Sequence, residues 1–341
     1  MKKIIIPFII LSLIPIALSA SIFGKTGTAS LQFLKLGVDA RAIGMGEAYT
    51  AVTNDVSSLY WNPAGISRNF GKQVMFSHTK WPASISHEFV GYSQETDFGI
   101  LGFQASILHM DDMDVTEENA FGPTGEKFTA SNVALGLTYA QAFTDKFSFG
   151  ITAKYLREDI WEENINNFSV DLGTLYNTGY KNLTVGMALR NFGPDIKYEI
   201  DYDEDGLVDE DPFDLFDNDG DGLTDEDRPE TEFKIPMNFS LGVAMDLMRQ
   251  ENRYWIASAQ IDNCVDRKET WNLGTEYNYN NMFLRAGKQI GYDAANYSFG
   301  FGVKVPTRIG SFDVDYAYTD MGRLAEDFLN SAHRVSVKLA F

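Results

Sequence analysis

Apolar and polar residues alternate with a period of two along most of the chain, which is the pattern of β-strands that have two different faces. In one stretch, Phe147, Phe149 and Ile151 alternate with Ser148 and Gly150. Similar alternation recurs many times, with an apolar, aromatic face opposite a face of small or polar residues. No window after the first twenty residues is apolar for long enough to form a transmembrane helix. The pattern therefore predicts an all-β fold.

A soluble β-sandwich would also alternate, but three features favour a transmembrane antiparallel β-barrel. Many strands reach about ten residues, the length a tilted strand needs to cross a membrane. The polar faces are rich in Gly, Ser and Thr, as expected of a lumen. The chain ends in strand pattern at Phe341, and a final aromatic residue resembles the recognition signal of outer-membrane barrels.

The alternating segments and the lengths of their connections predict a barrel over residues 73–341. The long connections, at 110–128, 193–233 and 319–330, all occupy odd positions in the order, and every even connection is short. Outer-membrane barrels keep short turns on the periplasmic side and long loops outside. Fourteen strands are expected, at 73–80, 85–94, 98–109, 129–142, 146–158, 166–177, 181–192, 234–247, 252–263, 269–279, 281–289, 295–304, 310–318 and 331–341.

Residues 21–72 do not alternate and predict a short, partly helical N-terminal plug. Ala40 to Ala48 is a flexible, close-packing stretch of small residues, and Asn54 or Asp55 can cap a short helix that follows. Pro63 ends that helix, because it moves Asn62 out of the helical region; with Ala64 these residues form the plug motif. A fourteen-stranded barrel encloses more space than its own side chains fill, so this segment is expected to close the lumen. A periplasmic tail with one helix is the alternative.

The first twenty residues predict a secretory signal peptide. Two lysines precede an apolar run, and Ala17-Leu18-Ser19 offers a cleavage site. The run is too short for a retained anchor, the weaker alternative. The single cysteine, Cys264, can form neither an internal disulfide nor a metal site by itself. No catalytic or nucleotide-binding motif occurs, so the chain is not expected to be an enzyme.

The net charge of −20 is concentrated in an acidic insert at 195–232. Residues 201–230 contain fifteen acidic residues and one basic residue, a net of −14 that leaves −6 for the rest. This sign disfavours a nucleic-acid partner.

Two segments of the insert share one spacing: Asp-x-Asp-x-Asp-Gly-Leu-x-Asp-Glu-Asp. Carboxylates at positions 1, 3 and 5 before a glycine match the start of a calcium loop. Pro212 and Arg228 replace the final bidentate Glu of an EF-hand, so the repeats are closer to thrombospondin type 3 or dockerin-like loops. Structural calcium is the expected cofactor, and a solvated acidic loop is the alternative. The candidate ligands are Asp201, Asp203, Asp205, Asp209, Asp211, Asp217, Asp219, Asp221, Asp225 and Asp227.

One long motif carries a family resemblance. The run GVDARAIGMGEAYTAV at 37–52, continued through Asn54-Asp55 to YWNPAG at 60–65, resembles the signature of PorV/PorQ outer-membrane proteins. These in turn resemble FadL-type fatty-acid transporters, which share the Asn-Pro-Ala motif. The resemblance implies a fourteen-stranded barrel with an N-terminal hatch. The acidic insert is not part of the common pattern.

Three roles stay open that the sequence does not separate; the resemblance implies the first two, and the acidic insert suggests the third. The first is support for protein export or surface display, with secretion-system components or secreted cargo as partners. The second is a FadL-like conduit for hydrophobic small molecules, for which an apolar lumen around the plug would be evidence. The third is a calcium-dependent surface scaffold or adhesin. Each role places the chain in the outer membrane, in contact with lipid.

Overall fold

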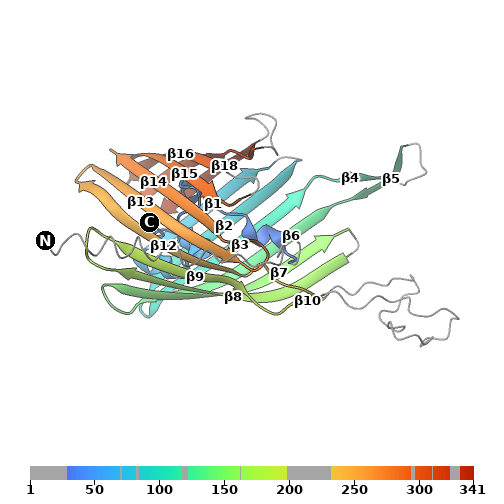
Figure 1. Cartoon of the computed structure of the whole chain (residues 1–341), viewed down its shortest axis with the longest axis horizontal. Coiled ribbons are helices and arrows are strands. Elements are labelled where there is room, and N and C mark those ends of the chain that lie inside the picture. Colours follow the sequence, from blue (N-terminus) through green and yellow to red (C-terminus); the bar gives the residue numbers. More distant parts are fainter. Residues whose placement is uncertain are drawn as a thin grey trace.

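The barrel is seen in a computed structural model that describes residues 29–69, 71–81, 84–116, 122–161, 163–197, 232–292, 296–308, 310–322 and 331–341. Within these residues fourteen antiparallel strands form a closed barrel (Figure 1), and β18 pairs with β1 to close it. The barrel strands are β1 (Lys72–Lys80), β2 (Ile85–Thr96), β3 (Gly99–Met110), β6 (Ala130–Ala142), β7 (Phe147–Ile160), β8 (Glu163–Asn177), β9 (Thr184–Phe192), β12 (Asn238–Gln250), β13 (Arg253–Cys264), β14 (Thr270–Tyr279), β15 (Met282–Ile290), β16 (Tyr297–Thr307), β17 (Gly310–Thr319) and β18 (Ala332–Ala340). The predicted fold and strand number are confirmed.

The two faces of each strand have opposite polarity, and the apolar face is the outer one. Leu137 and Phe168 are 67% and 65% exposed, whereas Thr152 and Lys154 are 0% and 5% exposed. A soluble protein would bury the apolar set instead. The apolar exterior is therefore the surface that lipid covers. No helix in the described ranges is long and apolar enough to cross a membrane.

The connections separate the two ends of the barrel, here called the short-turn end and the long-loop end. The connections after β2, β6, β8, β12, β14 and β16 are all short and lie at one end. The long-loop end carries two strand pairs that the sequence pattern did not predict, β4 (Met113–Thr116) with β5 (Pro123–Phe128) and β10 (Ile196–Lys197) with β11 (Glu232–Phe233). Both pairs lie within long connections, outside the barrel ladder.

The described part of the N-terminal segment, residues 29–69, lies inside the barrel and is called the plug (Figure 1). It contains η2 (Gln32–Lys35), α2 (Ala40–Gly44), α3 (Ser58–Trp61) and η3 (Pro63–Arg68). Ala29 forms a bridge with Lys234 at the long-loop end. Lys72 N–H donates to Phe341 O at the short-turn end. The plug thus runs the length of the lumen.

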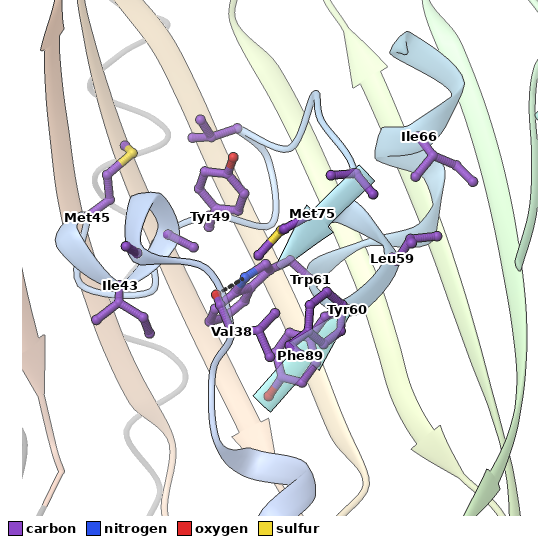
Figure 2. Packing of buried hydrophobic residues seen from close by; sticks show 14 of the residues in the cluster. Val38, Ile43, Met45, Tyr49, Leu59, Tyr60, Trp61, Ile66, Met75 and Phe89 are labelled. Atoms are coloured by element: carbon purple, nitrogen blue, oxygen red, sulfur yellow. Dashed lines mark hydrogen bonds between the residues drawn. The ribbon is translucent and has the colours of Figure 1, made fainter. Parts of the chain in front are cut away.

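The plug has its own apolar core around Trp61 (Figure 2). The Trp61 indole N–H donates to the carbonyl of Val38 at 3.0 Å, and its ring packs edge-on against Tyr49 and Tyr60. The close packing expected at Ala40 to Ala48 is confirmed. This stretch forms α2 and a turn, and nearly all of it is buried, because its small residues pack directly on the wall.

Candidate functional site: the plug and its contacts with the wall

A row of inward-facing glycines lets the plug backbone touch the barrel wall. We call it the glycine girdle. A Cβ atom built on Gly186 would lie 2.5 Å from Thr50 O, and one on Gly150 would lie 2.5 Å from Ala64 N. No side chain fits at such distances, so glycine is needed for close approach rather than for flexibility. Within the described residues the girdle takes one glycine from each of nine strands: Gly91, Gly102, Gly150, Gly173, Gly186, Gly242, Gly274, Gly287 and Gly300. The first two face the plug side chains of Val56 and Leu59, and the other seven face plug backbone.

The predicted plug motif lies against this girdle. Asn62 is fully buried, and its amide donates to Thr50 O at 2.9 Å and to Thr174 O of β8 at 3.1 Å. Its Oδ1 accepts the N–H of Ala64 at 3.2 Å, so Asn62 also caps η3, which begins at Pro63. The motif therefore ends one helix, starts the next and fastens both to the wall.

A buried charge network joins the plug to the opposite wall near the short-turn end. Arg41 of α2 makes two hydrogen bonds to Glu276 of β14, both 2.8 Å long. Glu276 also accepts from Arg285 at 2.6 Å, and Arg285 reaches Asp315 at 2.6 Å. Paired, hydrogen-bonded charges of this kind are tolerated in a buried site, whereas breaking one pair is costly.

Lys338 of β18 adds a second connection between the wall and the plug. Its ammonium group lies 2.7 Å from Asp39 and 2.8 Å from Asp55, two plug carboxylates on either side of α2 and the turn after it. Burial alone would raise the pKa of Asp55, but Lys338 and Arg41 lower it well below its usual range. Asp55 also accepts from Ser57 N–H at 3.0 Å, so Asp55, rather than Asn54, caps the turn into α3.

At the long-loop end the plug is held by different contacts. Gln32 and Lys35 both donate to Asp266, which follows β13, at 2.9 and 2.8 Å. Apolar residues of the plug and of the lumen wall form a cluster beside these polar contacts. Its buried members are Leu31, Phe33, Leu34, Ala134, Leu156, Ile165, Ile196 and Ile235.

Several cavities lie beside the plug in the described part of the chain. Two lie near the short-turn end, of about 290 and 330 Å³, and share Arg41 and Asn54 in their walls. Another, of about 320 Å³, lies at the long-loop end beside Leu31 and Phe33. The short-turn cavities are lined mainly by charged and polar groups, whereas the long-loop cavity touches the apolar cluster.

The structure brings some of the predicted site residues together and does not test others. Asn62, Pro63 and Ala64 form one buried unit, as described above. All ten candidate calcium ligands, from Asp201 to Asp227, lie outside the described residues, as does the predicted signal peptide. Within the described residues no group of three or more His, Cys, Asp or Glu side chains could hold a metal ion.

Sequence reasoning missed the charge network and the glycine girdle. A signal for the network was present: Glu276, Arg285, Asp315 and Lys338 occupy the polar, lumen-facing positions of their strands. The girdle glycines recur on the same face. Neither pattern shows by itself which plug residue would meet which strand.

The apolar exterior, the closed ladder and the buried N-terminal segment define a plugged outer-membrane β-barrel. A family model described as type IX secretion system protein PorV matches residues 23–216, more than half of the chain, and the protein belongs to this family. The PorV resemblance stated from the motif at 37–65 is confirmed. A search of curated protein sequences found no match.

Solved structures similar to this chain are FadL-like barrels. The Ralstonia pickettii toluene transporter TbuX has a TM-score of 0.54 and 11% identity over 89% of this chain and 98% of its own. A Pseudomonas aeruginosa FadL homologue has a TM-score of 0.54 and 13% identity over 90% and 99%. The Pseudomonas putida toluene transporter TodX has a TM-score of 0.54 and 12% identity over 94% and 98%. At such identities the likeness shows the shared fold alone.

Proposed function

We propose that this protein supports protein export at the outer membrane as a type IX secretion component whose own lumen stays closed. The family carries the secretion role. The proposed partners are secretion-system components or secreted cargo, met at the long-loop end or along the outer wall. We further infer that the protein is not an enzyme.

The observation that carries the closed-lumen part of the proposal is the girdle contact. Plug backbone from Gly44 to Ala64 meets girdle glycines of seven strands. Side chains of the plug are also bonded to the wall, Arg41 to Glu276 and Asn62 to Thr174 O. A cargo chain that passed through the lumen would first have to displace these packed contacts. The role is therefore assigned to the outside of the barrel rather than to its interior.

A plug locked to the wall tests this assignment. Ala40 N–H donates to Ser336 Oγ of β18 at 2.8 Å, so cysteines at these two positions are well placed to bond. We expect a strain lacking the native protein to regain cargo export when it expresses A40C/S336C in a Cys264→Ser background, both oxidised and reduced. Each single cysteine variant is the control. Export that stops on oxidation and returns with reductant would show that the plug has to move.

A second candidate function is a conduit for hydrophobic small molecules. The observation that favours it is the apolar cluster of Leu31, Phe33 and Leu156 in the lumen, next to the long-loop cavity. The toluene transporters share the fold but not enough sequence to carry their substrate over. Uptake of a labelled aromatic hydrocarbon into cells with and without the protein tests this function. Equal uptake would exclude it for that substrate class.

The acidic insert supports a further part of the proposal, that calcium orders the repeats at 201–211 and 217–227. Packed carboxylates repel one another without a cation, and the spacing places oxygen ligands as calcium loops do. Millimolar calcium outside the cell suits weak sites of this kind. In this role the loop is a calcium-stabilised surface for a partner.

A further inference from the structure

One of the two cavities at the short-turn end is lined by an arginine that has no countercharge. This cavity, of about 330 Å³, lies between the plug, the turn from β8 to β9 and the short-turn ends of β12 and β13. Arg68, the last residue of η3, lines it and is half-buried. We call this space the Arg68 cavity.

The Arg68 side chain differs from the other arginines of the cavity wall. Within the described residues it takes part in no ion pair and no hydrogen bond. Burial lowers the pKa of the Arg68 guanidinium, and no neighbouring charge in the described part of the chain opposes this shift. Arg41 and Arg249 line the same cavity but are paired with Glu276 and Asp246. Since a charge removed from water is costly unless it is paired and hydrogen-bonded, Arg68 is the group that a ligand can satisfy.

The strongest hydrogen-bond acceptor of the cavity wall is already engaged. Asp246 is the one carboxylate among the described lining residues. Its Oδ1 accepts from Arg249 at 3.0 Å, and its Oδ2 accepts from Asn182 at 2.6 Å and from Arg249 Nε. Asn177, at the end of β8, also lines the cavity, and its amide nitrogen has no hydrogen-bond partner in the described ranges. The cavity therefore offers positive charge and N–H donors without a free carboxylate.

The rest of the cavity wall is apolar. Val52 of the plug, Ala244 of β12 and Ile256 of β13 line it, and the first two are buried. Small-molecule sites have volumes of about 300–1,000 Å³, so the Arg68 cavity is at the lower end of this range. It has room for a small organic group beside an anion.

We propose that the Arg68 cavity binds a small organic carboxylate, about the size of an amino acid, that carries an apolar group and enters from the short-turn end. A guanidinium group binds both oxygens of a carboxylate at once, and Asn177 supplies a further donor. Val52, Ala244 and Ile256 supply the surface for the apolar group. The site does not depend on the export role, because it lies inside the barrel mouth, whereas export is assigned to the outside of the barrel.

Thermal unfolding of the full-length protein in an uncharged detergent tests the site. The probes are N-acetyl-leucine, its neutral amide, which lacks only the carboxylate, and sodium acetate, which lacks the apolar group. We expect millimolar N-acetyl-leucine to raise the melting temperature of the wild type, because a ligand that binds only the folded state stabilises it. The amide and acetate should have little effect. Calorimetric titration with the same three probes measures the affinities directly.

Two variants locate the binding. Arg68→Gln should weaken binding of N-acetyl-leucine by about tenfold or more, because it removes charge-assisted hydrogen bonds. Arg253→Gln is the matched control: Arg253 is exposed at the same end of the barrel, donates to Gln250 at 2.6 Å rather than to a carboxylate, and is not among the described lining residues. Its loss should leave binding unchanged.

The comparison of acid and amide on the wild type covers the case in which a variant does not fold. The proposal is overturned if millimolar N-acetyl-leucine gives neither stabilisation nor heat. Equal stabilisation by N-acetyl-leucine and by either other probe, or an equal loss of binding in both variants, also overturns it.

Discussion

Replacing one girdle glycine by alanine should loosen the plug while leaving the barrel intact. Gly186 and Gly242 are direct partners on β9 and β12, and both face Thr50 and Ala51 of the plug. A Cβ on Gly186 would lie 2.5 Å from Thr50 O and 2.9 Å from Ala51 Cα. A Cβ on Gly242 would lie 3.2 Å from its nearest neighbour, Ala51 N. Gly186→Ala and Gly242→Ala thus add the same methyl group beside the same plug residues, but only the first brings it into steric clash with the plug backbone.

The free-energy cost of Gly186→Ala depends on how firmly the carbonyl group of Thr50 is held. To reach ordinary contact of 3.4 Å, Thr50 O would have to move by about 0.9 Å. This carbonyl accepts from Asn62 at 2.9 Å, and Thr50 N–H donates to Gln260 at 2.9 Å, so such a shift strains both bonds. Overpacking of this kind costs about 1–3 kcal/mol. We therefore expect Gly186→Ala to open the plug about 5- to 150-fold more often.

Hydrogen exchange of plug amides from 40 to 64 in the folded, detergent-solubilised protein measures this opening. Gly242→Ala is the control and should change protection little, because alanine also removes the backbone entropy cost of a strand glycine. Heat-modifiable gel migration reports that the barrel has formed. Unchanged plug protection in Gly186→Ala, or an equal loss in both variants, would refute the reasoning from close backbone contact.

Further predictions concern the charge network, the lumen and the acidic insert. Glu276→Gln should destabilise the folded protein by about 3 kcal/mol or more, since it leaves two buried guanidinium groups without their shared carboxylate; an unchanged thermal midpoint would contradict this. A folded deletion of residues 25–65 should conduct far larger currents in planar bilayers than the wild type, and equal conductance would refute the plug assignment. Calorimetric titration should show weak calcium binding that Asp217→Asn with Asp221→Asn reduces, with magnesium a poor competitor; no heat at millimolar calcium would leave the insert a solvated acidic loop. Protease added to intact cells should cut within 193–233, and cleavage only after permeabilisation would reverse the proposed topology.

The sequence by itself determined the barrel strands, the number of barrel strands and the outer-membrane class, but not the two strand pairs in the long connections. Alternation such as that from Phe147 to Ile151 is visible within a few residues, because side chains of a strand point to opposite faces in turn. The short connections at even positions in the strand order are also visible in the sequence, because each is only a few residues long. Asn62-Pro63 also marked its helix boundary from the sequence alone, since proline restricts the residue before it.

Only the tertiary structure decided how the lumen is filled. Arg41 and Glu276 are 235 residues apart in the chain, and they meet because closure of β1 on β18 fixes the position of every strand around the plug. The girdle glycines likewise acquire their role from one common approach of the plug backbone, which no local pattern records. A period of two shows which face of a strand a residue occupies. It does not show how far along the barrel axis the residue lies or which plug residue it contacts, because both depend on the register and closure of the whole barrel.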